Sequence, residues 1–173
     1  GFVALLIDLG DFPRAGEIIA QMDRSKVHDL RADEQRLRYL VLTGAGQSGV
    51  STMRNAVARH SKNVPVRLAG ARVYLQAEDY TRAASYFQQA KRNGANPRLA
   101  DTGLALAQMY GRRKLGAENS LERALDAVDA EGNALEATPE VRVWELIVKA
   151  RLALADEKRG LAVRYAKQAV AIA

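Results

Sequence analysis

Small and aromatic residues recur at fixed distances in residues 64–97, and this pattern constrains the fold more than any other feature of the chain. The pattern consists of Ala71, Tyr74, Asp79, Tyr80, Ala83, Phe87 and Ala90. Spacings of three and four residues place the members of each half on one face of a helix. The alanines let two helices approach closely, and the aromatic rings fill the space around those contacts. The segment therefore predicts two helices packed against each other.

Helical patterns of the same kind extend over the rest of the chain, and no segment alternates convincingly as a strand. A composition rich in alanine, leucine and arginine also favours helices. We expect helices at 11–23, 33–43, 50–60, 65–76, 79–93, 97–110, 119–128, 138–155 and 157–173. The basic segment 111–118 is expected to be a loop. The expected helix N-terminal caps include Asp11, Asp33, Asn119 and Thr138.

These helices form about five pairs, the first of which lacks part of its first helix. Five pairs in 173 residues give an average of about 34 residues per pair, the period of stacked helix–turn–helix repeats. The sequence thus predicts an all-α fold, a right-handed α-solenoid of about five antiparallel helix pairs. The expected array covers 1–173, with approximate repeats 1–32, 33–64, 65–96, 97–137 and 138–173. The chain begins with "GFVALLI" and ends with "AVAIA", both apolar. We therefore expect a fragment of a longer protein whose ends meet flanking repeats or another copy of the chain.

The unit at 64–97 resembles the tetratricopeptide repeat (TPR), in which a small residue precedes a tyrosine by three positions and Gly-Asp-Tyr, alanine, a large residue and alanine follow. The second half of this pattern is also visible at Gly10-Asp11-Phe12 with Ala15, Ile19 and Met22, and more weakly at Ala162, Ala166 and Ala169. The form "PVRLAGARVYLQAEDY", with a first helix about one turn short after Pro65, is similar to repeats of bacterial periplasmic scaffolds that accompany exopolysaccharide synthesis and export. The resemblance implies a TPR-like superhelix acting as a non-catalytic protein–protein interaction scaffold. The absence of cysteine is compatible with both the cytoplasm and the periplasm, and the resemblance slightly favours the bacterial periplasm.

Residues 44–52, "GAGQSGVST", match the dinucleotide-binding pattern G-x-G-x-x-G and come close to a phosphate-binding P-loop. A dinucleotide site needs a strand before this loop and an acidic residue about 20 positions later. The sequence there is "RLAGAR", which has no acid. A P-loop needs a lysine where Val50 stands. We therefore expect a turn between two helices, with no nucleotide as partner or cofactor.

Residues 35–77 contain basic but no acidic side chains: Arg36, Arg38, Arg54, Arg59, Lys62, Arg67 and Arg72. In TPR arrays the first helices of the pairs line a concave groove, so the resemblance implies partner-binding roles for Arg38, Arg72, Gln76, Gln108 and Arg151. Arginine at such positions would hold the carboxylates of a protein or acidic peptide. The same charges could instead form a solvated helix surface. The alternative function is binding of an anionic polymer, an acidic polysaccharide or RNA, although few aromatic residues are available for base stacking.

The remaining side chains form no recognisable catalytic or metal-binding set. The chain has no cysteine, which excludes disulfides and thiolate chemistry. His28 and His60 lie on different elements and lack the spacing of zinc ligands. No triad or paired acid–base group is assembled, so we expect no enzyme activity, no metal and no cofactor. No apolar run reaches the roughly 20 residues needed to cross a bilayer, so we expect no membrane insertion.

Overall fold

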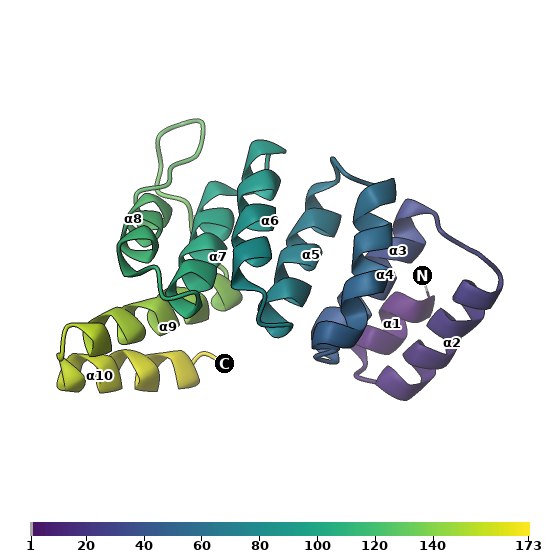
Figure 1. The fold of residues 1–173 in the computed structure, drawn as a ribbon, viewed down its shortest axis with the longest axis horizontal. Helices are drawn as coiled ribbons and strands as arrows, with labels where there is room; N and C mark the ends of the chain where they lie inside the picture. Colours follow the sequence, from purple (N-terminus) through teal and green to yellow (C-terminus); the bar gives the residue numbers. More distant parts are fainter. Residues whose placement is uncertain (1) are drawn as a thin grey trace. The chain divides into compact units, whose positions relative to one another are not determined.

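The computed structural model describes residues 2–173, which form ten helices in two compact units (Figure 1). The first unit ends at Asp79 and the second covers Tyr80–Ala173. The helices of the first unit are α1 (Phe2–Asp8), α2 (Phe12–Arg24), α3 (Leu30–Leu42), α4 (Gly46–Arg59) and α5 (Val64–Gln76). Those of the second unit are α6 (Tyr80–Arg92), α7 (Pro97–Tyr110), α8 (Lys114–Leu125), α9 (Pro139–Ala155) and α10 (Arg159–Val170).

Side-chain caps fix the starts of several helices. Each capping side chain accepts a hydrogen bond from the backbone N–H three residues later, at 2.8–3.3 Å, and the capping residues are Asp11, Asp29, Asn63, Asn96 and Thr138. The caps expected at Asp11 and Thr138 are therefore confirmed. The cap expected at Asp33 is wrong, because α3 begins at Leu30 after Asp29. Asn119 is not a cap either, because α8 begins at Lys114, inside the segment expected to be a loop.

Helix α5 is not shortened. It begins at Val64, one residue before Pro65, and has 13 residues, as many as α3. Proline is accommodated in a first turn because its missing N–H would have no partner there. The expected loss of one turn after Pro65 is therefore wrong.

The turn that joins the two helices of a pair contains a residue with a left-handed backbone. These turn residues are Gly10, Gly44, Glu78, Arg112 and Glu157, with φ between 58° and 74°. The first four are 34 residues apart, and the last follows after 45 because α9 and the loop before it are longer than their counterparts. A left-handed residue at this place ends one helix and lets the next begin. Equal distances from the turn residues therefore identify equivalent positions in the pairs.

Equivalent positions in the second helices carry the packing contacts. The residue five positions after each turn residue is small and buried: Ala15, Gly49, Ala83, Ala117 and Ala162. The residue nine positions after the turn is large and buried at Met53, Phe87 and Leu121. In the second unit, the ring of Phe87 lies so close to Gly103 of α7 that a Cβ at Gly103 would be 2.4 Å from it. The edge of the same ring meets Trp144 of α9, with ring centroids 6.0 Å apart.

The loop between α8 and α9 has its own internal contacts. Val128 and Ala134 form an isolated antiparallel bridge, the one β-type pairing in the described part of the chain. The carboxylate of Asp129 accepts hydrogen bonds from the backbone N–H groups of Glu131 at 3.0 Å and Asn133 at 2.8 Å. These contacts close a short hairpin, which Figure 1 shows extending away from α8.

We predict that Gly103→Ala destabilises the chain even though alanine favours helices by about 1 kcal/mol over glycine. The added methyl group would overlap the ring of Phe87, and overpacking of this kind costs about 1–3 kcal/mol. Thermal unfolding of the variant should show a lower midpoint. Gly160→Ala is the matched control, because a Cβ there meets nothing within 4 Å. An equal decrease in both variants would contradict the proposed contact.

We also predict that Arg112→Gly stabilises the chain by about 0.5–1 kcal/mol, because glycine adopts a left-handed backbone without the cost that a Cβ brings. Arg112 has φ 58° and is exposed. Gly44→Ala at the equivalent turn should lower stability by a similar amount, since Gly44 has φ 65° and open space around its Cβ position. Urea unfolding of the two variants should give midpoints that shift in opposite directions.

Candidate functional site

The predicted binding residues of the first unit lie on α3 and α5, which pack against each other. Arg38 and Arg72 are 34 residues apart and so hold equivalent positions. Arg38 donates a hydrogen bond from Nη2 to Oδ1 of Asp8 at 2.5 Å, in a pair whose side chains are 44% and 55% exposed. Arg72 is half-buried. Gln76 is exposed, and its Nε2 donates to the carbonyl oxygen of Val41 at 2.7 Å.

In the second unit, Gln108 does not hold a position equivalent to Arg38 and Arg72. Its Oε1 accepts a hydrogen bond from Oγ of the buried Ser120 at 2.8 Å, so its side chain lies between α7 and α8. Gln108 stands 34 positions after Tyr74, which is buried in α5. The residue of α7 that is equivalent to Arg38 and Arg72 is Leu106. The resemblance placed Gln108 in the groove, whereas the structure places its side chain against Ser120.

Arg151 does hold the equivalent position in α9, 45 residues after Leu106. Its side chain is exposed, and its guanidinium carbon lies 4.0 Å from the ring centroid of Tyr110 at the end of α7. Tyr110 in turn stacks on Tyr80, with ring centroids 5.4 Å apart. A guanidinium held over an aromatic face is attracted by the negative π surface. The contact therefore restricts the orientation of Arg151 while its hydrogen-bond donors remain available.

An apolar trough of about 380 Å³ lies next to Arg151. We call it the α9–α10 trough, and its lining includes Tyr110, Ile147, Ala150, Arg151, Ala166 and Ala169. Sequence analysis did not identify it. The available signal was Ala166, which follows its turn residue at the distance where Met53, Phe87 and Leu121 are large and buried.

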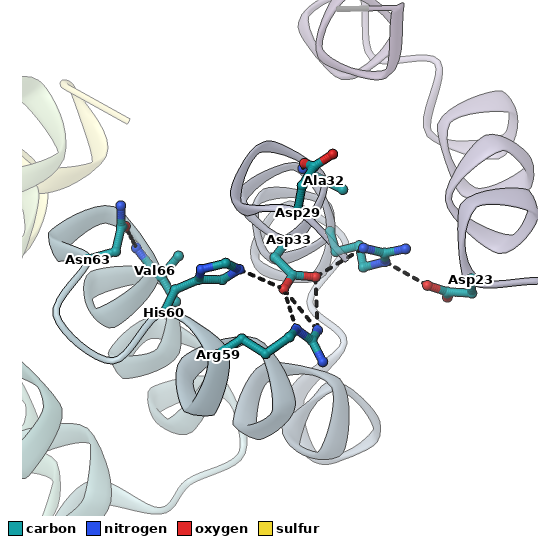
Figure 2. A network of polar contacts seen from close by, with 9 residues as sticks. Asp23, Asp29, Ala32, Asp33, Arg59, His60, Asn63 and Val66 are labelled. Atoms are coloured by element: carbon teal, nitrogen blue, oxygen red, sulfur yellow. Dashed lines mark hydrogen bonds and ion pairs between the residues drawn. The ribbon is translucent and has the colours of Figure 1, made fainter. Parts of the chain in front are cut away.

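Several basic side chains of the stretch 35–77 pair with acids outside it, and Figure 2 shows the cluster around Asp33. The carboxylate of Asp33 is fully buried and accepts hydrogen bonds from Arg59 Nε at 2.8 Å and Arg59 Nη2 at 3.0 Å. Arg36, whose side chain is 2% exposed, donates from Nη1 to Asp33 at 3.0 Å and from Nε to Asp23 at 2.6 Å. With Arg38 bound to Asp8, three of the seven basic side chains in this stretch are paired with acids that precede residue 35.

The pKa of Asp33 shows which effect dominates in this cluster. Burial alone would raise the pKa of the carboxyl group, because it disfavours the charged form. The hydrogen bond from Arg59 and the positive charges of Arg59, Arg36 and His60 outweigh burial and hold the pKa below its ordinary value of 3.8. Nε2 of His60 lies 3.2 Å from Oδ2 of Asp33. Asp33 is therefore an ionised acceptor that joins α3 to α4 and to the residue that follows α4.

Besides Arg38, exposed positive charge of the basic stretch lies outside the first helices. Arg54 on α4 and Lys62 in the loop before α5 are both exposed. Nη2 of Arg67 donates to the carbonyl oxygen of Ser61 at 2.5 Å, which ties Arg67 to the same loop. The positive charge counted along the sequence is therefore not a continuous charge on the first helices.

The turn expected in the glycine-rich segment 44–52 is limited to residues 44 and 45, because helix α4 begins at Gly46 and not near residue 50. A Cβ on Gly46 would lie 3.2 Å from the carbonyl oxygen of Gln76. Gly46 thus serves the close approach of α4 to α5. In residues 2–173 no cluster of three or more histidine, aspartate or glutamate side chains is placed to hold a metal ion. None of the helices described combines the length and apolar character required to cross a bilayer.

We predict that Asp33→Asn lowers the free energy of unfolding by about 3–5 kcal/mol, the usual cost of removing one partner from a buried ion pair. Because the folded-state pKa lies below 3.8, Asp33 stabilises the fold at any pH above 3.8 and loses that contribution as the pH falls through the folded value. Urea unfolding at a series of pH values should show this acid-dependent loss in the parent chain and a weaker one in Asp33→Asn. Asp23→Asn, at a 53% exposed carboxylate, is the control and should cost less than about 1 kcal/mol.

Comparison with known proteins establishes the fold. No protein-family model matches the chain, and no curated protein matches it. Among solved structures, the chain is similar to the crystal structure of a thermophilic TPR protein of Thermus thermophilus, with a TM-score of 0.65 and 20% sequence identity. The likeness covers 98% of this chain and 95% of that one. The expected all-α fold of TPR-like helix pairs is therefore confirmed.

Proposed function

We propose that the chain is a non-catalytic scaffold that binds acidic segments of partner proteins through the first helices of the pairs within each of its two units. The observation that carries this proposal is the recurrence of arginine at one position in α3, α5 and α9. These residues are Arg38, Arg72 and Arg151, related by the turn spacings of 34 and 45 residues. Gln76, exposed at the end of α5, belongs to the same surface in our proposal, whereas Gln108 does not.

The geometry of Arg38 fits exchange with a partner carboxylate. Its pair with Asp8 joins two side chains that are about half exposed, and such pairs contribute only about 0–1 kcal/mol. A carboxylate of an incoming segment can replace Asp8 at small cost, because guanidinium groups bind carboxylates through two parallel hydrogen bonds. Asp8 then keeps Arg38 oriented while no partner is bound.

We further propose that this scaffold serves bacterial exopolysaccharide synthesis or export in the periplasm. The support is the resemblance of the residues "PVRLAGARVYLQAEDY" to repeats of such scaffolds. The length of α5 adds no support, since that helix is as long as α3.

An anionic polymer is the second candidate ligand, favoured by the exposed Arg54 and Lys62, which lie outside the arginine positions of the first helices. A polyanion is bound through charge density and shows steep salt dependence. A protein segment is bound through particular side chains. The two candidates therefore predict different responses when equal charge is removed from different places.

We predict that Arg38→Gln with Arg72→Gln weakens binding of acidic peptides tenfold or more, because one hydrogen bond to a charged group contributes about 1.5–3 kcal/mol. The probe is the best-binding peptide from a displayed library of random peptides, which should be rich in Asp and Glu. Its affinity for the parent and the variant is measured by fluorescence anisotropy at a fixed salt concentration.

The control variant is Arg54→Gln with Lys62→Gln, which removes the same charge from exposed positions on α4 and in the loop before α5. Its affinity for the peptide should stay within about twofold of the parent. Equal weakening in both double variants, with steep salt dependence, would instead favour the anionic polymer. Recovery of no acidic peptide would refute the scaffold proposal for the first unit.

A further inference from the structure

The α9–α10 trough is equivalent to the surface of the preceding pair, α7 and α8, on which α9 packs. Its residues Ile147, Arg151, Ala166 and Ala169 lie 45 positions after Thr102, Leu106, Leu121 and Ala124. The four earlier residues, on α7 and α8, are at most 6% exposed, and α9 packs on both of those helices. Ile147 is only half-buried, and Arg151 and Ala166 are exposed. The trough therefore has the form of a surface that receives a helix.

The trough also lacks a large side chain that its counterpart has. Ala166 stands where α8 has Leu121 and where α6 has Phe87, and both of those side chains are buried. The alanine leaves the space of a large side chain unfilled. Burial of this apolar surface by an incoming apolar group is favourable, because it removes both from water. An incoming helix can therefore supply the large residue that α10 lacks.

The charge of the trough indicates the charge of an incoming helix. Where α9 packs on α7, Glu145 is 4% exposed and pairs with Arg98, whose Nε and Nη2 donate to its two carboxylate oxygens at 2.7 and 3.1 Å. The residue of α9 equivalent to Arg98 is Val143, which lines the trough, so this ion pair is not repeated at the same position. In the trough, Arg151 is the charged side chain of the lining, and no acidic residue lines it. Its contact with the ring of Tyr110 holds the guanidinium at the edge of the apolar surface.

We propose that the α9–α10 trough binds an amphipathic α-helix of a partner protein, whose apolar row fills the space above Ala166 and whose carboxylate pairs with Arg151. The inference rests on the proposed scaffold function and names the kind of partner that the second unit takes. The partner helix carries apolar residues at i, i+3, i+4 and i+7, with Asp or Glu beside that row.

The test uses the full chain and a phage-displayed library of 18-residue helical peptides, about five turns long, in which the apolar row is kept and all other positions are random. The strongest peptide should contain Asp or Glu next to the apolar row. Changing that acid to its amide should weaken binding at least tenfold, as should Arg151→Gln. Ala166→Leu fills the trough from within and should also weaken binding at least tenfold. Val163→Leu adds the same kind of side chain at an exposed position of α10 outside the trough and should change affinity less than twofold.

The outcomes separate this inference from the scaffold proposal. Arg38→Gln with Arg72→Gln should leave binding of the trough peptide unchanged. If peptides bind but depend on Arg38 and Arg72 and not on Arg151 and Ala166, the scaffold stands and the trough inference fails. Recovery of no peptide sensitive to Ala166→Leu also overturns it. If sedimentation equilibrium shows self-association of the parent that Ala166→Leu abolishes, the occupant is a second copy of the chain, and the partner helix is refuted.

Discussion

Contacts between a large side chain on one helix and a glycine on its neighbour determine how closely the helices of this chain pack. The ring of Phe87 rests against Gly103, the hydroxyl of Tyr39 lies over Gly16, and the methyl groups of Leu40 face Gly49. In each case an added Cβ would stand within 3.3 Å of the opposing side chain. Interiors of proteins are packed densely enough that such contacts leave little freedom.

Burial of a single carboxylate changes the electrostatics of the first unit. Asp33 neutralises Arg36 and Arg59 at the junction of α3 and α4, and Asp8 does the same for Arg38 at the surface. The charge that a segment carries along the sequence therefore differs from the charge that it presents. The guanidinium groups that recur on the first helices are identified by their position relative to the turn residues, which relates Arg38, Arg72 and Arg151.

The fold was accessible from the sequence because its determinants are local. Asp11 and Thr138 cap helices through bonds that reach only three residues, and the spacing of Ala83, Phe87 and Ala90 needs only a helix. Asp33 could not be placed in this way, because its partners Arg59 and His60 lie 26 and 27 residues later. The left-handed turns at Glu78, Arg112 and Glu157 lacked the glycine that marks such turns.

The candidate site was harder to predict from the sequence than the fold, because it depends on residues from several helices. Which residues share a surface depends on counting from the turns, and only Gly10 and Gly44 marked the spacing of 34 residues in the sequence. The resemblance alone therefore led to Gln108, which bonds Ser120, and away from Leu106 and Tyr110. Prediction of the trough from the sequence would have required the observation that Ala166 stands where Met53, Phe87 and Leu121 are large.

Ala166 is informative because it is exposed in this chain, whereas its equivalents in the preceding three pairs are buried. Burial of a leucine side chain stabilises a fold by about 1.5–3 kcal/mol relative to leaving it exposed. The preceding pairs gain this contribution from Met53, Phe87 and Leu121. Ala166 departs from the packing pattern of the other pairs, and it lies beside the guanidinium of Arg151, which Tyr110 orients. These two features together favour a binding surface over a packing defect. In the complex that we propose, the large side chain at this place comes from the partner helix.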